Sequence, residues 1–216
     1  MGNEIQFKSK RNKVFYRGGR VIKAFADPMG AKAEAETLRR YRDAGLHVPK
    51  VFSCCDNLIE MEYIPGDTIP DFLERLEKPS ATAEIIDEAD RLAKIRTTEI
   101  RSAASMLVEW FAQFYKLVDH ANSGEIRGDV NGRNFIISHD RIVGVDFEER
   151  AYGSIERDIG RLLAFIRTYD LPGESAQRRF ARLFCRLAVK RLHLSPDEIR
   201  KQYRLEITAM KERRGN

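Results

Sequence analysis

Two short stretches of sequence decide the fold: IRGDVNGRN at residues 126–134 and GVDFE at residues 144–148. Together they supply Asp129, an asparagine five residues later at Asn134, and a second aspartate, Asp146, at the end of a short apolar strand. Phosphoryl transfer requires such a set, because one carboxylate orients the attacking hydroxyl while amide and carboxylate oxygens hold Mg²⁺ against the phosphates. The pattern therefore predicts phosphotransfer chemistry on hard oxygen ligands.

These residues resemble the catalytic and metal-binding loops of the protein-kinase-like phosphotransferases. Gly128 before the first aspartate is similar to the aminoglycoside and choline kinase branch, and also to the RIO and tRNA-modification-associated small kinases. Ordinary protein kinases carry arginine at that position. The resemblance implies that Asp129 is the catalytic base and that Asn134 and Asp146 bind the metal. The alternative for all three is turn chemistry, because Asp and Asn favour loops.

The resemblance extends to a lysine and a glutamate nearer the N-terminus. Lys23 lies on the predicted third strand and resembles the lysine that contacts the nucleotide phosphates. Glu34, on the helix that follows, resembles the glutamate that pairs with this lysine. Glu36 is the competing assignment, two residues later and therefore on a different face of the helix. The alternatives are an exposed lysine on a strand and a glutamate on a helix surface.

Residues 59–66, IEMEYIPG, resemble the hinge between the two lobes of a kinase. The resemblance implies that adenine lies near Met61 and bonds to the backbone of Glu62 and Ile64. Nucleotide binding is therefore expected at this segment as well as at the predicted lysine–glutamate pair.

Further positions fit the resemblance or depart from it. Asp158 resembles the buried aspartate that braces the catalytic loop, with a helix N-terminal carboxylate as the alternative. Arg127 stands where a structural histidine is expected, and we assign it to support of the same loop. Glu148 replaces the glycine of the metal-binding motif. The predicted phosphate loop, residues 9–13, contains no glycine, so its basic side chains could contact phosphate instead.

Patterning predicts an α+β chain of two unequal lobes. Short β-prone runs predict strands at 4–8, 14–17, 21–25, 48–52, 57–63, 134–137 and 142–145. Apolar spacing and composition predict helices at 31–44, 71–76, 82–96, 102–122, 155–169, 174–193 and 196–211. Pro65-Gly66 divides a nucleotide-binding lobe, residues 1–63, from a catalytic and substrate lobe, residues 64–216. The resemblance implies a bilobal protein-kinase-like fold, with a small antiparallel sheet and one helix preceding a mostly helical lobe.

The formal net charge is +5, and residues 178–214 carry 12 Lys or Arg against 4 Asp or Glu. Such a surface could favour an anionic acceptor or nucleic acid, the latter being the less favoured partner. The residues at i, i+4 spacing form one stripe, which we interpret mainly as the exposed face of an amphipathic helix. The members of the stripe are Arg178, Arg182, Arg186 and Lys190.

No apolar run approaches the ~20 residues of a membrane span, and the N-terminus lacks the pattern of a signal peptide. The three cysteines, Cys54, Cys55 and Cys185, are too few and poorly spaced for a disulfide framework or a zinc site. We therefore expect a cytoplasmic protein with reduced thiols. Trp110 lies among aromatic residues at helical spacing, which favours core packing over base stacking.

The residues and the resemblance together predict an ATP-dependent phosphotransferase. It would transfer the γ-phosphoryl group to a hydroxyl acceptor, a small molecule or saccharide, with ATP and Mg²⁺ as cofactors. One alternative is a small atypical serine/threonine protein kinase or an ATPase of the RIO or tRNA-modification type. Another is a nucleotide-binding pseudokinase module, which Arg127 and the glycine-free phosphate loop motivate.

Overall fold

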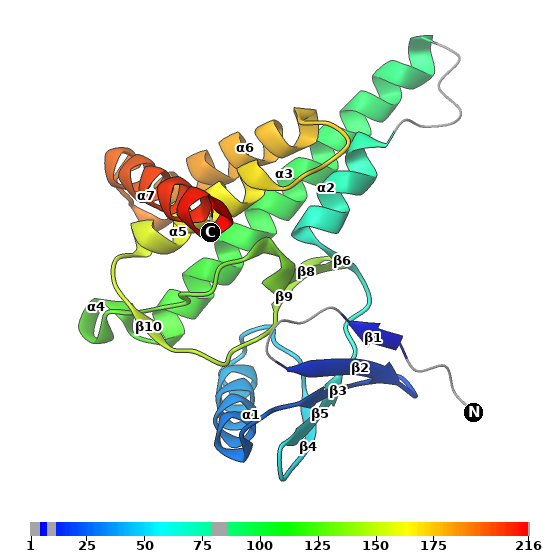
Figure 1. The fold of residues 1–216 in the computed structure, drawn as a ribbon. Helices are drawn as coiled ribbons and strands as arrows, with labels where there is room; N and C mark the ends of the chain where they lie inside the picture. The colour runs from blue at the N-terminus through cyan, green and yellow to red at the C-terminus, as the bar shows by residue number, and fades with distance from the viewer. Residues whose placement is uncertain (1–4, 8–11, 79–85, 216) are drawn as a thin grey trace.

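The computed structural model describes residues 5–7, 12–78 and 86–215. A small antiparallel sheet with one helix lies beside a larger, mainly helical part (Figure 1). The predicted α+β class and its arrangement, with a small sheet before a mostly helical lobe, are therefore confirmed.

The five N-terminal strands form one antiparallel sheet in the order β1-β2-β3-β5-β4. They are β1 (Ile5–Phe7), β2 (Lys13–Arg17), β3 (Arg20–Ala24), β4 (Val51–Cys55) and β5 (Leu58–Glu62). Gly18 and Gly19 form the turn between β2 and β3 with φ angles of 60° and 81°, which a two-residue hairpin of this kind requires. The hairpin places β3 in the middle of the sheet, between β2 and β5.

Helix α1 (Pro28–Asp43) follows β3 and packs against β4 and β5. Asp27 caps its N-terminus by accepting a hydrogen bond from the backbone N–H of Met29 at 3.1 Å. The buried face of α1 includes Ala31, Glu34 and Leu38. A glutamate on this otherwise apolar face requires a partner in the interior.

The mainly helical part contains six α-helices and two small sheets among the described residues. The helices are α2 (Ile69–Glu77), α3 (Ile86–Leu117), α4 (His120–Ser123), α5 (Ile155–Thr168), α6 (Ser175–Leu192) and α7 (Pro196–Gly215). Strands β6 (Asp67–Thr68), β8 (Phe135–Ser138) and β9 (Arg141–Gly144) form one sheet, and β7 (Glu125–Ile126) pairs with β10 (Ala151–Tyr152). A short 3₁₀ turn, η1 (Gly132–Asn134), lies between β7 and β8.

The predicted break between helices at 82–96 and 102–122 is wrong, because α3 runs continuously from Ile86 to Leu117. Thr97 and Thr98 lie inside it, and their hydroxyls donate to the carbonyls of Ala93 and Lys94 at 2.7 and 3.1 Å. These bonds satisfy the hydroxyls within the helix, so the two threonines do not end it. Residues 82–85 of the first predicted helix lie outside the described residues.

Trp110 of α3 anchors the core, as its spacing predicted. Its side chain is buried, stacks on Phe114 with ring centroids 5.6 Å apart, and meets Phe135 edge-on at 5.2 Å. The indole N–H donates to the carbonyl of His47 at 3.0 Å. A Cβ on Gly144 would lie 2.3 Å from the Trp110 ring. The core therefore fixes the end of β9, two residues before Asp146.

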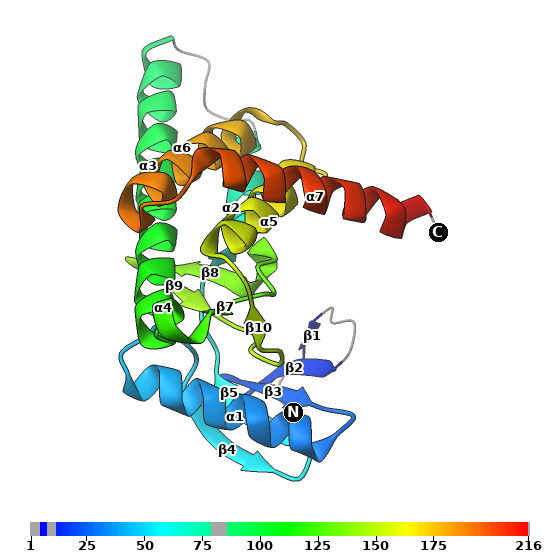
Figure 2. The ribbon, with the colours of Figure 1, turned by 90° about the vertical axis from the view of Figure 1, so that its left-hand side faces the viewer.

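Helices α5, α6 and α7 complete the helical part. Helix α7 lies against α5, and its C-terminal end projects from the body of the protein (Figure 2). The predicted basic stripe of α6 is exposed along its length, as on an amphipathic helix. Among the described residues, no helix has the length and apolar character needed to cross a membrane.

Candidate phosphotransfer site

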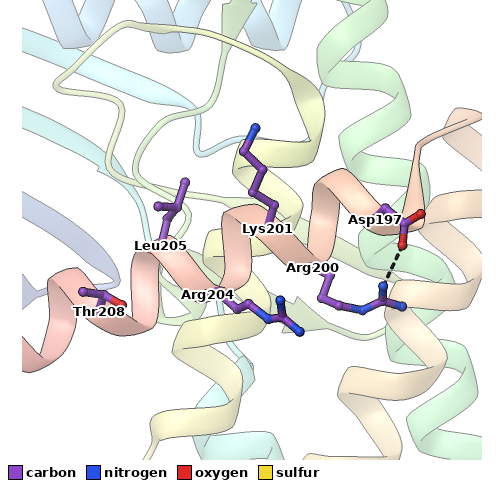
Figure 3. Close-up of a pocket in the computed structure, with 6 residues that line it drawn as sticks. All are labelled: Asp197, Arg200, Lys201, Arg204, Leu205 and Thr208. Carbon is purple, nitrogen blue, oxygen red and sulfur yellow. Dashed lines mark hydrogen bonds and ion pairs between the residues drawn. The ribbon is translucent and has the colours of Figure 1, made fainter.

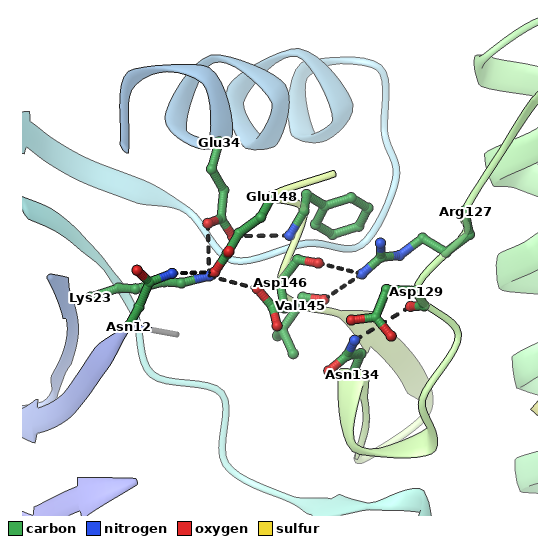
Figure 4. Close-up of polar contacts among 10 residues, drawn as sticks. Asn12, Lys23, Glu34, Arg127, Asp129, Asn134, Val145, Asp146 and Glu148 are labelled. Carbon is green, nitrogen blue, oxygen red and sulfur yellow. Dashed lines mark hydrogen bonds and ion pairs between the residues drawn. The ribbon is translucent and has the colours of Figure 1, made fainter. Parts of the chain in front are cut away.

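Lys23 connects three segments of the chain. It lies on the central strand β3 with its side chain buried. Its Nζ lies 2.8 Å from Glu34 Oε2 on α1, 2.6 Å from Asp146 Oδ1 and 2.7 Å from Glu148 Oε1 (Figure 4). Glu36, the competing partner, is exposed on α1. The lysine–glutamate pair that the structure forms is therefore Lys23–Glu34.

Burial and charge act in opposite directions on these groups. Burial alone would lower the pKa of Lys23, but Glu34 and Asp146 raise it above its ordinary value. Burial alone would raise the pKa of Asp146, but the charge and hydrogen bond of Lys23 bring it below its ordinary value. The Lys23–Asp146 pair is thus charged at neutral pH. An ammonium held at this point can contact phosphate oxygens.

Arg127 holds the segment that carries Asp146. Asp146 has a φ of 65°, in the left-handed region that is strained for a residue with a Cβ. The guanidinium of Arg127 donates to the carbonyls of Val145 and Asp146 at 2.8 and 2.5 Å. It also lies 4.2 Å from the centroid of the Phe147 ring. Arg127, which stands where a histidine was expected, therefore braces the backbone of the predicted metal-binding segment directly.

Glu34 supports the same segment from α1. Its Oε1 accepts a hydrogen bond from the backbone N–H of Phe147 at 3.0 Å, while Oε2 faces Lys23. Burial raises the pKa of Glu34, although Lys23 acts in the opposite direction. One glutamate therefore fixes the lysine of the sheet and the backbone beside Asp146.

Asp158 at the start of α5 holds the predicted catalytic loop, residues 127–134, through its backbone. Its fully buried carboxylate accepts hydrogen bonds from the backbone N–H groups of Arg127 at 2.7 Å and Gly128 at 3.0 Å. The Tyr115 hydroxyl donates to it at 2.9 Å. Burial raises its pKa despite these three donors. Asp129 follows immediately in the loop, with its side chain exposed.

Gly128 is required by its surroundings as well as by its backbone. Its φ is 74°, and a Cβ there would lie 2.4 Å from the Cβ of Ala151 on β10. The close approach of β10 therefore demands glycine directly before Asp129. This gives a physical reason for the residue that distinguishes the loop from that of ordinary protein kinases.

The far side of the catalytic loop is held by Tyr169, just after α5. Its hydroxyl donates to Asn131 Oδ1 at 2.9 Å and accepts from the backbone N–H of Gly132 at 2.8 Å. Asn134 donates through Nδ2 to the carbonyl of Asp129 at 3.4 Å. Sequence reasoning missed Tyr169, because nothing in its local pattern distinguishes it from a core aromatic residue.

Three carboxylates gather beside Lys23 and could hold a cation. Glu34, Asp146 and Glu148 each offer an oxygen, and these oxygens lie within 4.8 Å of one another. All three lie against the single ammonium of Lys23. Asn134, the other predicted ligand, has no hydrogen bond to its amide oxygen among the described residues. This set of hard oxygen donors fits Mg²⁺.

Glu148, which the sequence pattern marked only as a departure, belongs to this cluster. Besides its contact with Lys23, it accepts a hydrogen bond from the amide of Asn12, the residue just before β2 (Figure 4). The sequence signal that could have placed Glu148 in this cluster is its position two residues after Asp146. Of the predicted phosphate loop, residues 9–11 lie outside the described residues, and Lys13 is exposed.

Some groups of the segment predicted to bind adenine, residues 59–66, already have partners within the protein. Met61 is buried in the sheet. The backbone N–H of Glu62 donates to the Lys50 carbonyl at 2.8 Å, and its side chain pairs with Arg42 at 2.9 Å. The N–H and carboxylate of Glu62 are thus committed to the sheet and α1. The carbonyl of Glu62 and the backbone of Ile64 remain predicted to contact adenine.

A separate hollow lies on the surface of α7 (Figure 3). All of its lining residues come from that one helix, and Asp197 forms an ion pair with Arg200 at 2.6 Å. Arg200, Lys201 and Arg204 make it basic. None of the residues predicted for phosphotransfer lines this hollow, so it is distinct from the cluster around Lys23.

Comparison with known proteins places the fold. No protein-family model and no curated protein matches the sequence. The ADP-bound aminoglycoside phosphotransferase APH(2'')-Ib is 14% identical, with a TM-score of 0.51 over 93% of this chain and 81% of that chain. The streptomycin–ATP ternary complex of APH(2'')-IIa is 16% identical, with a TM-score of 0.52 and the same coverages.

A third solved structure is matched over nearly its whole length. The aminoglycoside-3'-phosphotransferase of type VIII is 14% identical, with a TM-score of 0.50 over 94% of this chain and 92% of that chain. The chain therefore has the kinase-like fold of the aminoglycoside phosphotransferases, as the sequence resemblance implied.

Proposed function

We propose that this protein is an ATP-dependent phosphotransferase that transfers the γ-phosphoryl group of ATP to a hydroxyl group. The observation that carries the proposal is the convergence at Lys23. This one ammonium lies within 2.8 Å of carboxylate oxygens on Glu34 and Asp146, which come from opposite parts of the fold. Asp129 is exposed on the braced loop nearby (Figure 4). Phosphoryl transfer depends on such positioned charges.

In this proposal, each side chain has one task. Lys23 contacts the nucleotide phosphates, with Glu34 holding it in place. Asn134 and Asp146 hold Mg²⁺, with Glu148 close enough to join them. The ion neutralises negative charge on the phosphate oxygens when it is bound. Adenine lies between the two lobes, residues 1–63 and 64–216, near Met61, Glu62 and Ile64.

Asp129 acts on the acceptor. Its carboxylate hydrogen-bonds the acceptor hydroxyl and takes its proton as the oxygen attacks the γ-phosphorus, and the bond to the ADP oxygen breaks. Within the described part of the chain, this carboxylate accepts one long hydrogen bond, 3.4 Å from Oδ1 to the backbone N–H of Asn131. The carboxylate is therefore available to an acceptor that enters from solvent.

The acceptor is proposed as a small molecule or saccharide. Of two solved structures with this fold, one is named for a ternary complex with streptomycin and ATP, and the other is named as ADP-bound. For this chain, a hydroxyl-bearing acceptor agrees with the exposed carboxylate of Asp129. A protein acceptor would instead make it a small atypical protein kinase.

Turnover of Mg-ATP tests the proposal. The purified protein is incubated with γ-labelled ATP, alone and with pools of metabolites, saccharides and proteins, with and without EDTA. We expect label to pass to an acceptor in the metabolite or saccharide pool, and EDTA to stop it. Binding of Mg-ATP without transfer to any pool or to water would contradict the proposal and favour a nucleotide-binding module.

A further inference from the structure

Arg161 of α5 links the C-terminal helix to the catalytic loop. Its Nε lies 3.0 Å from Glu206 Oε2 on α7. The same guanidinium donates from Nη1 to the carbonyl of Gly128 at 2.8 Å. Gly128 directly precedes Asp129 in the chain. One planar side chain thus bonds to α7 and to the peptide group that begins Asp129.

The link is anchored firmly at its α7 end. Glu206 is buried and uses both carboxylate oxygens, because its second oxygen lies 2.6 Å from the guanidinium of Arg213. The neighbouring Gly160 lets α7 approach α5 closely: a Cβ there would lie 2.7 Å from Gln202 Cβ and 2.8 Å from the Tyr203 nitrogen. Glu206 therefore presents its carboxylate to Arg161 from a closely packed helix.

Both backbone groups of Gly128, the N–H and the carbonyl, are hydrogen-bonded to side chains of α5. Its N–H donates to Asp158 at 3.0 Å, and its carbonyl accepts from Arg161 at 2.8 Å. Asp158 and Arg161 lie three residues apart, on one face of α5. Because Gly128 has no Cβ to restrict its φ and ψ angles, and has a φ of 74°, its own backbone preference does not fix the direction of the next residue. The two bonds from α5 fix it instead.

We propose that Arg161 is a positioning residue for Asp129, and that Glu206 of α7 holds Arg161 in the position this requires. The inference rests on the proposed function, in which Asp129 meets the acceptor hydroxyl. Arg161 has no described contact with Lys23, Glu34 or Asp146. Its loss should therefore slow the chemical step and leave nucleotide binding intact. Small displacements of a reacting group are costly, about 10²-fold for roughly 1 Å.

Three variants of the full-length protein test the proposal. Arg161→Ala removes both bonds, and Arg161→Lys leaves a cation but not the planar pair of donors. Glu206→Gln retains the size of the side chain and removes its charge. The matched control is Arg191→Ala, which breaks an interhelical pair with Glu109 whose N–O distances are 3.0 and 3.1 Å, far along the sequence from the loop. Melting temperatures identify variants that are only destabilised.

The readouts are kcat and KM for Mg-ATP turnover and amide hydrogen exchange of the segment 125–132. We expect Arg161→Ala and Arg161→Lys to lower kcat by about 10- to 100-fold with KM within about 2-fold. Exchange in this segment should rise, and Glu206→Gln should give a smaller effect. The double variant Arg161→Ala/Glu206→Gln should match Arg161→Ala alone, because both act through one contact.

The proposal would be overturned if Arg161→Ala behaved like Arg191→Ala in both kcat and exchange at 125–132. It would also be overturned if the two changes at Arg161 and Glu206 were additive in kcat. A wild-type protein without turnover would refute the proposed function but not this inference. In that case the exchange of 125–132 in Arg161→Ala and Arg161→Lys still decides it.

Discussion

Arg127 shows how one side chain replaces another in the same supporting role. The family pattern predicts a histidine, but the arginine reaches two successive carbonyls at 2.8 and 2.5 Å and lies on the Phe147 ring. The Nε of Arg127 is buried and has no hydrogen-bond partner among the described residues, which is an unfavourable consequence of having arginine at this position. One of the two bonds falls on the carbonyl of Asp146 itself, whose φ of 65° lies in the left-handed region.

Replacing this arginine should therefore destabilise the protein. Arg127→Met retains most of the apolar volume and removes both charged hydrogen bonds, which predicts a loss of about 3 kcal/mol in the free energy of unfolding. Urea unfolding measures it, with Arg40→Met as the control, because Arg40 is an exposed residue over the Tyr41 ring. Equal losses for the two variants would show that Arg127 does not brace the segment.

Asp158 predicts a pH dependence of stability. Burial raises its pKa, so the folded state binds its proton more tightly than the unfolded chain does. Ionisation therefore costs stability as the pH rises from the ordinary carboxyl pKa, about 3.9, through the raised one. Asp158→Asn cannot ionise. The free energy of unfolding of the wild type should fall relative to that of this variant as the pH rises above about 4.

Urea unfolding of both proteins at each pH measures this difference, and the comparison cancels the titration of groups that the two share. A difference that stays constant, or that changes in favour of the wild type, would contradict the raised pKa of Asp158.

At the level of elements, α5 positions the predicted catalytic loop. Its residues Asp158 and Arg161 hold the loop before Asp129, and Tyr169 just after the helix holds it beyond. Strand β10 packs closely against the loop at Gly128. The loop is therefore confined on several sides, while the Asp129 side chain stays open to solvent.

A methyl group at Gly128 should break this arrangement. Gly128→Ala would combine the strain of a left-handed residue, about 1–2 kcal/mol, with overpacking against Ala151, about 1–3 kcal/mol. Gly45→Ala is the matched control, because Gly45 has a φ of 86° and a Cβ added there would meet no described atom within 4 Å, so strain alone applies. Thermal unfolding compares them. Equal destabilisation by the two changes would refute the contact with β10.

Sequence patterns located most of the long elements but not the short ones. The strands around Lys23 and helix α1 follow from β-prone runs and helix-forming composition. Strands β6, β7 and β10 contain two residues each, too few to show a period. Helix α3 was divided in error, because its two threonines satisfy their hydroxyls within the helix.

In the candidate site too, sequence patterns indicated some residues and missed others. Motif spacing predicted Lys23, Asp129, Asn134, Asp146 and Asp158 as site residues, with Glu34 or Glu36 as the partner of Lys23, because these residue types recur together in one order. It could not identify Arg161, Tyr169 or Glu206, whose contacts join segments that are distant in sequence. It also could not choose between Glu34 and Glu36, since that choice depends on which face of α1 meets the sheet.

The whole molecule joins its two parts through buried polar contacts. Lys23 of the sheet meets Asp146, and Tyr41 of α1 donates to Glu125 of β7 at 3.2 Å. The proposed nucleotide site lies at this junction. Asp129, the proposed base for the acceptor hydroxyl, lies on the helical side. The proposed function therefore separates binding from chemistry: in it, the sheet and the junction would hold ATP, while the loop that carries Asp129 would act on the acceptor.

The most direct test of this account is Asp129→Asn, measured for both Mg-ATP affinity by calorimetry and phosphoryl transfer. The amide retains the oxygen that accepts from Asn131, so the loop should keep its shape. We predict Mg-ATP affinity within about 3-fold of wild type and a rate of transfer lowered by about 10²–10⁴-fold, the contribution of a general base. Transfer at the wild-type rate by this variant would contradict the account.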